Sequence, residues 1–572
     1  MKRSLHGVVA IILVAATAAA ADTPPTETAA AQFDDTARVD IVNIWVRVTD
    51  RGGVPVDGLQ LTNFELLVDG EPVQIVNFIA IPAAGGPPAN GVVEPSMSAV
   101  DPDRYLVIFV DNRGGGPLVR DKALRELASQ LPAYLADGRT IMLASQNGAI
   151  RVLHGFADDP EELAGRLDEL ASTTVGGSLL AVERADLLDA MDRTTPHTGI
   201  DFVSEISVQG IETEAKALLQ RTRTYAENLL NDQRERLAML SRFQASLAGL
   251  PGDKVLLYIG EGFDTRPGEA LFRIWEQKYP DLAEDLSFSA DLESGRYRIE
   301  DELTALAAQA NASGVSCYTL YTAGGARFSP MAAESSGAAG RGRSIAMSAR
   351  RGVEDSLAYL ATTTGGLALF PGGDPGAAIA RLPDQLVRNY SLGFEPIVGD
   401  DQAVHRVEVV VRRKDLKVRH RESYRFKTID ERMSELTYAA LLFEPGPNPF
   451  EAALSLAGVE AKDRDLFEVT VEMTVPMAKL ALVPSKGTHV GQVKVFFAVK
   501  DERGWASPVR VQSFPVLIPN TSLATALAET GTFAWKMMAR EGPHELAVTA
   551  RDGLAETVST VTLEFEVPAS TE

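Results

Sequence analysis

The chain has 572 residues, of which 45% are hydrophobic and 23% charged, and its formal net charge at pH 7 is −23. The composition is that of a folded globular protein, and the chain is too long for one hydrophobic core, so roughly three to four domains are expected. The acidic charge weighs against a nucleic acid partner, because binding a polyanion requires clustered lysine and arginine.

Residues 1–21 have the three parts of a secretory signal peptide. Two basic residues precede an apolar core from Val8 to Val14, and a run of small residues ends at Ala21. We therefore expect an exported protein, periplasmic or extracellular, whose mature chain begins near Asp22. No later apolar stretch approaches the roughly 18 residues that cross a bilayer, so no membrane span is expected in the mature chain.

The next segments predict a disordered leader over residues 22–36 and a small β module over residues 37–81. The leader is rich in Thr, Ala and Pro. In the module, apolar and polar residues alternate from Val42, and a hairpin signal follows at Asp69. The Pro/Gly-rich residues 82–102 are expected to be a linker.

Residues 103–426 alternate strand and helix patterns, which predicts a mostly parallel sheet covered on both faces. The first strand is RYLVIFVDNRGGG, residues 104–116, an apolar run that ends in Asp111 and three glycines. Ligands of such sheets sit at the carboxyl ends of the strands. Cys317, the single cysteine, lies in the strand pattern GVSCYTLY, which predicts a buried thiol without a disulfide partner.

Two segments of this domain have a second interpretation. An unusually long helical pattern, an insertion over about 205–249, carries a leucine-rich stripe that either packs on the domain's own surface or forms a coiled coil with a partner. Residues 324–352 are rich in Arg and Gly and form either a solubilising surface loop or a clamp for an anionic ligand. From residue 429 to 568 the alternation of strands predicts an antiparallel β-sandwich of immunoglobulin-like type.

Five motifs together resemble the von Willebrand factor A-related domain family of exported bacterial proteins. They are VRVTDRGGVPVDGL, FELLVDGEPVQIVNF, LPGDKVLLYIGEGFD, LAYLATTTGGLALF and NYSLGFEP. The resemblance implies a central α/β domain with a Rossmann-like, mostly parallel sheet, flanked by the β module and the β-sandwich. It implies a fold and does not imply a measured activity.

In this family, a metal-ion-dependent adhesion site uses the motif DxSxS, a later hydroxyl and a carboxylate after a further strand, which suit a hard divalent cation. The resemblance places Asp111 at the aspartate, Ser178 at the hydroxyl and Glu261 at the carboxylate, with Thr174 and Asp264 as the alternatives for the last two. These are the candidate metal ligands.

Arg113 and Gly115 stand where the motif has its two serines, which predicts a degenerate site without Mg²⁺ or another cofactor. Arg113 either replaces the cation by pairing with Asp111 or points to solvent. The ligand-binding residues expected at this edge are Asp111, Asn112, Arg113, Ser178, Glu261 and Asp264.

Sequence signals for catalysis are weak. GxSxG and HExxH are absent, and the carboxylates of EDLSFSADLE, residues 284–293, are the best candidates for a hydrolase. The sequence therefore predicts an exported, non-enzymatic protein-binding or adhesion-type module whose partner is a protein or an envelope component. The alternatives are an architectural envelope scaffold without ligand binding at the site and a hydrolase.

Overall fold

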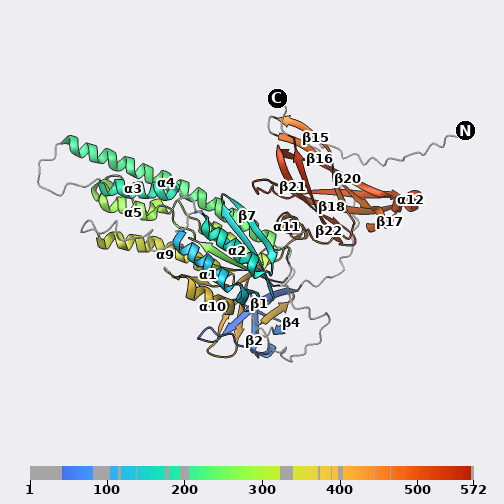
Figure 1. The fold of residues 1–572 in the computed structure, drawn as a ribbon, viewed down its shortest axis with the longest axis horizontal. Coiled ribbons are helices and arrows are strands. Elements are labelled where there is room, and N and C mark those ends of the chain that lie inside the picture. Colours follow the sequence, from blue (N-terminus) through green and yellow to red (C-terminus); the bar gives the residue numbers. More distant parts are fainter. Residues whose placement is uncertain are drawn as a thin grey trace. The chain divides into compact units, whose positions relative to one another are not determined.

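The computed structural model describes residues 41–568 apart from 81–103, 114–116, 137, 174–178, 194–204, 251, 323–338, 372–373, 388–389, 397–402, 444 and 464–465. The expected signal peptide, the leader and the whole linker therefore lie outside the described residues. The described part of the chain is a mixed α/β protein with one largely parallel sheet and several antiparallel sheets (Figure 1).

A six-stranded sheet forms the centre of residues 104–386. Its strands, in spatial order, are β10 (Ala368–Leu369), β9 (Val315–Tyr321), β8 (Asp253–Gly260), β5 (Arg104–Asp111), β6 (Arg139–Asn147) and β7 (Ala149–Ala157). Neighbouring strands are parallel except β7, which is antiparallel to β6. The ends of β5, β6 and β8 and the start of β7 therefore share one edge, which we call the upper edge.

Helices cover both faces of this sheet. Alternate residues of β5 enter two cores, with Leu106 and Ile108 in one and Val107 and Phe109 in the other. The first core contains α1 (Pro117–Leu135), α2 (Pro160–Ser172) and α10 (Gly376–Leu386). The second contains α3 (Leu179–Arg193), α4 (Glu205–Leu247), α5 (Glu269–Lys278), α6 (Pro280–Asp285), α7 (Ala290–Ser294), α8 (Glu300–Ser313) and α9 (Ala339–Thr363). Burial on both faces explains why β5 is a continuous apolar run.

The long helical pattern forms one continuous helix, α4, of 43 residues, which corresponds to about 65 Å. Its apolar stripe belongs to the same buried core as β5, so it packs on its own domain, the first of the two interpretations. The buried residues of the stripe are Leu219, Ala226, Leu230, Leu237, Leu240, Phe243 and Leu247. Within the described residues, no helix combines the length and the apolar character needed to cross a membrane.

The small β module is larger than residues 37–81. The strands β1 (Val42–Thr49), β2 (Phe64–Val68), β3 (Glu71–Val73) and β4 (Ile75–Ala80) pair with β11 (Tyr390–Phe394), β12 (Val404–Val411), β13 (Lys417–Arg419) and β14 (Ser423–Arg425). They form two four-stranded sheets around one core. Residues 390–425, which we assigned to the α/β domain, therefore complete this module. The sequence pattern did not indicate this, because their pairing partners lie more than 300 residues earlier in the chain.

The C-terminal region begins with a helix that the strand pattern did not predict, α11 (Ile429–Leu442). The hydroxyl of Thr428 accepts a hydrogen bond from the backbone of Glu431, whose side chain bonds back to Thr428, an arrangement that starts a helix. Ala440 and Leu441 of α11 pack on the following sheet, and Leu442 packs on the α4 core. The helix therefore connects the α/β domain to the C-terminal strands.

Two antiparallel sheets follow α11 and share one core. One contains β15 (Ala453–Asp463), β16 (Leu466–Pro476) and β20 (Thr530–Arg540), and the other β17 (Val483–Ser485), β18 (Thr488–Asp501), β21 (Gly542–Asp552) and β22 (Val558–Val567), with β19 (Arg510–Pro519) paired to β18. A short helix, α12 (Leu523–Leu527), lies between β19 and β20. The alternating pattern of β16 places each second residue in this core.

Residues 324–352, expected to be a loop, are in part helical. Residues 324–338 lie outside the described residues, whereas 339–352 belong to the first turns of α9. Arg350 on this helix pairs with Glu354 one turn later at 2.7 Å, so at least this arginine is engaged within the helix.

Candidate functional site

The carboxylate of Asp111 lies at the end of β5 and is almost completely buried, with 1% of its side chain exposed. Three groups donate hydrogen bonds to it. The Tyr258 hydroxyl donates at 2.6 Å, the backbone N–H of Arg113 at 3.1 Å, and the Arg236 guanidinium through both Nε, at 3.2 Å, and Nη2. Both carboxylate oxygens are therefore occupied by groups of the chain itself.

Arg236, from α4, carries the positive charge of this site. Its guanidinium also donates to the carbonyl of Gly262 at 3.3 Å and lies 4.9 Å from the centre of the Phe263 ring. Burial is the largest single influence and lowers the pKa of Arg236, but Asp111, Tyr258 and Asp232 together outweigh it and raise the pKa above its ordinary value. The ion pair is thus charged and shielded from water.

Burial, followed by the charge of Asp111, also raises the pKa of the Tyr258 hydroxyl well above its ordinary value. The phenol therefore stays protonated and donates to Asp111. At Gly260, an added Cβ would lie 2.9 Å from the Tyr258 hydroxyl and 3.0 Å from the Cβ of Asp111. A glycine at the end of β8 is thus required for the close approach of this pair.

The expectation that Arg113 replaces the cation is wrong. Its guanidinium turns to α4, where it pairs with Asp232 at 2.7 Å and Glu235 at 3.1 Å, while only its backbone bonds to Asp111. Arg236, and not Arg113, is the cationic side chain that pairs with the Asp111 carboxylate. Sequence reasoning missed Arg236 because it is 125 residues from Asp111, on an insertion that the family motif does not include.

The surroundings of Asp111 do not provide the free oxygen ligands that a divalent cation needs. A cation needs free oxygen ligands, whereas the carboxylate oxygens already accept hydrogen bonds from three donors. Within the described residues, no group of three or more His, Cys, Asp or Glu side chains is arranged to hold a metal ion. The ion pair with Arg236 accounts for the charge of Asp111 without a metal.

We expect the unmodified chain to bind neither Mg²⁺ nor Mn²⁺ at millimolar concentration in isothermal titration calorimetry. Restoring the motif with Arg113→Ser and Gly115→Ser creates no site, because Arg236 still neutralises Asp111. Adding Arg236→Ala to these two changes frees the carboxylate and is expected to give measurable binding. Metal binding by the unmodified chain that Asp111→Ala abolishes would contradict this expectation.

The other predicted site residues have separate surroundings. Ser178 and Thr174 lie outside the described residues. Asn112, at the upper edge, accepts a hydrogen bond from Arg120 at 2.9 Å, and Glu261 is half-buried after β8. Asp264 accepts a hydrogen bond from the backbone N–H of Arg266 at 3.0 Å, and burial raises the pKa of this carboxyl to about 6.

Two of the four carboxylates in the acidic segment at residues 284–293 are held in ion pairs. Glu293 is buried and pairs with Arg223 at 2.8 Å, and Asp291 pairs with Arg273 at 2.6 Å. These two carboxylates hold neighbouring helices together.

A cavity of about 300 Å³, lined by both polar and apolar side chains, opens at the upper edge beside Asn112. Asn112, Ser145 and Asn147, from the ends of β5 and β6, line one side, and the C-terminal part of α2 lines the other. This volume reaches the lower end of the range typical of small-molecule sites, about 300 Å³. Sequence reasoning found Asn112 but missed Ser145 and Asn147, since neither belongs to the family motif.

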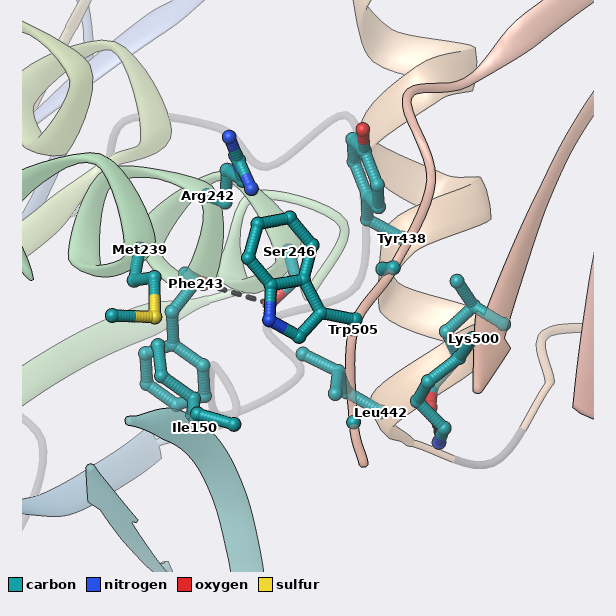
Figure 2. A pocket seen from close by; sticks show the side chains of 13 residues that line it. Ile150, Met239, Arg242, Phe243, Ser246, Tyr438, Leu442, Lys500 and Trp505 are labelled. Carbon is teal, nitrogen blue, oxygen red and sulfur yellow. Dashed lines mark hydrogen bonds between the residues drawn. The ribbon is translucent and has the colours of Figure 1, made fainter. Parts of the chain in front are cut away.

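A second, apolar cavity lies where α4 meets the C-terminal region, and its volume is about 80 Å³. Figure 2 shows the indole of Trp505 pointing toward α4, beside Arg242. The guanidinium carbon of Arg242 is 5.7 Å from the centre of the indole ring. The cavity is small for a ligand site, and its lining residues come from both regions, so it belongs to the joint between them.

No protein-family model matches the sequence, and no curated protein matches it. Solved structures with some likeness include an aerotolerance-related membrane protein from Bacteroides fragilis, at 11% identity and a TM-score of 0.20, covering 50% of this chain and 100% of that one. BatB from Bacteroides thetaiotaomicron has 11% identity and a TM-score of 0.16, with 38% and 66% covered. The type V pili tip protein Mfa5 from Porphyromonas gingivalis has 11% identity and a TM-score of 0.21, with 89% and 78% covered. At such scores these likenesses support no argument about function.

Proposed function

We propose that this chain is an exported, non-enzymatic binding protein of the von Willebrand factor A-related family, and that its α/β domain holds a protein or an envelope component without a metal ion. The observation that supports the proposal is the cavity at the upper edge, on the same edge as Asp111, whose carboxylate is closed by Arg236. Sheets of this class bind ligands at the carboxyl ends of their strands. The strand order and the motifs of residues 104–386 agree with an A-type domain.

The second candidate is an architectural scaffold in which the upper edge binds nothing. The ion pair between Arg236 and Asp111 favours it, because this pair satisfies the site entirely from within the chain. The two candidates differ in one respect that can be measured. A binding protein loses its partner when the cavity is filled, whereas a scaffold does not depend on the cavity.

The test is capture of partners from an envelope extract by the tagged full chain. Asn147 is exposed at the cavity mouth, so Asn147→Trp fills the cavity with little effect on the core. Gln512→Trp, on an exposed position of β19, is the matched control. We expect a partner that is retained in EDTA, retained by Gln512→Trp and lost with Asn147→Trp. Loss of the partner in EDTA, or equal capture by all three chains, would exclude the proposal.

A further inference from the structure

The lining of the upper-edge cavity contains hydrogen-bond donors beside the acceptor oxygens of Asn147, Glu169 and Thr173. Arg120, buried beneath it, donates to the side-chain oxygen of Asn112 at 2.9 Å. Because a guanidinium can only donate, this bond fixes the orientation of the amide and leaves its NH₂ group as the free end. In the part of the chain that the structure describes, this NH₂ group has no hydrogen-bond partner.

Ser145 adds a second unused donor. Ser145 is 7% exposed as a residue and Asn112 is 9% exposed, and both line the cavity. Among the described residues, the Ser145 hydroxyl makes no hydrogen bond either. Leaving buried polar groups unpaired costs free energy, so these two groups are suited to bond with water or with a bound molecule.

The charged side chains at the rim of the cavity indicate which kind of ligand it binds. Arg151 and Arg166 line the cavity together with Glu169, which pairs with Arg166 at 3.1 Å. Two guanidinium groups and one carboxylate leave a net charge of about +1, which one carboxylate group neutralises. A phosphate dianion would exceed this charge and would lie near Glu169.

We infer that the cavity binds a single carboxylate group, with Asn112 and Ser145 as neutral donors and Arg151 and Arg166 as cationic donors. The carboxylate belongs either to a free small acid or to the C-terminus of a peptide chain. The apolar side chains of Leu153 and Leu170 also line the cavity and provide contact area for the carbon skeleton next to the carboxylate. This inference rests on the proposed function, since it gives the recognition chemistry of the same edge.

The test compares N-acetyl-alanyl-leucine with its C-terminal amide, using saturation-transfer NMR and calorimetry on the full chain. We expect binding of the acid and at least tenfold weaker binding of the amide. The double variant Arg151→Gln with Arg166→Gln, at two exposed positions, should bind the acid at least tenfold more weakly. The control, Arg510→Gln with Arg540→Gln on the C-terminal sheets, removes the same charge and should bind normally.

Glu169→Gln provides a change in the opposite direction. It removes the negative charge from the rim and frees the guanidinium of Arg166, so the acid is expected to bind two- to tenfold more tightly. Propionate separates the two sources of the carboxylate. Equal affinity for propionate and the peptide acid identifies a free small acid, and tighter binding of the peptide acid identifies a chain terminus.

Equal binding of acid and amide, no binding of either, or unchanged binding by the double variant would overturn the inference. The proposed function fails separately, in the capture experiment. A captured partner that is lost with Asn147→Trp but is not displaced by the peptide acid would support the proposed function. The same result would contradict the inference that the cavity binds a carboxylate group.

Discussion

Replacing Arg236 with methionine is expected to lower the free energy of unfolding of the α/β domain by about 3–5 kcal/mol, because it leaves the buried carboxylate of Asp111 without its counter-charge. The Arg236 side chain is 8% exposed and that of Asp111 is 1% exposed, so water cannot replace the lost guanidinium. Native-state hydrogen exchange of β5, read by mass spectrometry, measures the change.

The matched control is Arg234→Met, two residues earlier on α4. Arg234 pairs with Glu302 at 2.6 Å, but 49% of its side chain is exposed, and exposed pairs contribute only about 0–1 kcal/mol. If the two variants lose protection equally, the pair between Arg236 and Asp111 is no more important than a surface ion pair. A double-mutant cycle with Asp111→Asn then gives the coupling energy of the pair.

Asp264 is expected to contribute stability that falls as the pH rises from about 4 to 6. Burial raises the pKa of its carboxyl from 3.8 to about 6 in the folded chain, so the folded state holds this proton more tightly than the unfolded state. The resulting stability is fully present below about pH 3.8 and is lost as the pH passes through about 6. Its upper limit is about 3 kcal/mol, which screening of the half-buried side chain reduces.

Asp264→Asn removes this titration and keeps an oxygen that can accept the hydrogen bond from the Arg266 backbone. We therefore expect the variant to be more stable than the unmodified chain at pH 7 and nearly equal to it at pH 4, in urea unfolding series at both values. Asp281→Asn, at an exposed position of α6, should leave the difference between the two pH values unchanged. A pH dependence that persists in Asp264→Asn would assign it to another group.

Local sequence patterns predicted the strands and helices of the α/β domain well where burial of the segment itself determines its structure. The run from Tyr105 to Val110 became β5 because both of its faces are buried, and the stripe of α4 became one continuous helix. Cys317 is fully buried in β9, as its strand pattern predicted, and burial raises the pKa of its thiol to about 12.

The remaining features depend on pairing between distant segments, which local periodicity does not contain. The register that joins β1 to β11 connects Ile44 with Leu392, and no property of either strand identifies the other. Arg236 looks like one of many charged residues of a long helix, and only the fold brings it to Asp111. The family motif likewise drew attention to Arg113 because it occupies a motif position, although its side chain bonds elsewhere.

The helix α4 makes two separate contacts, one with Asp111 at the upper edge and one with the C-terminal region at Trp505. Arg236 holds Asp111 at the upper edge, and Phe243, two turns later, lines the cavity at Trp505, an axial distance of about 10 Å. A rigid helix cannot shift at one of these places without shifting at the other, so the energies of the two contacts are linked. We therefore expect a change in the tilt of α4 at the joint to alter the strength of the Asp111 pair, and a coupling of this kind is reciprocal.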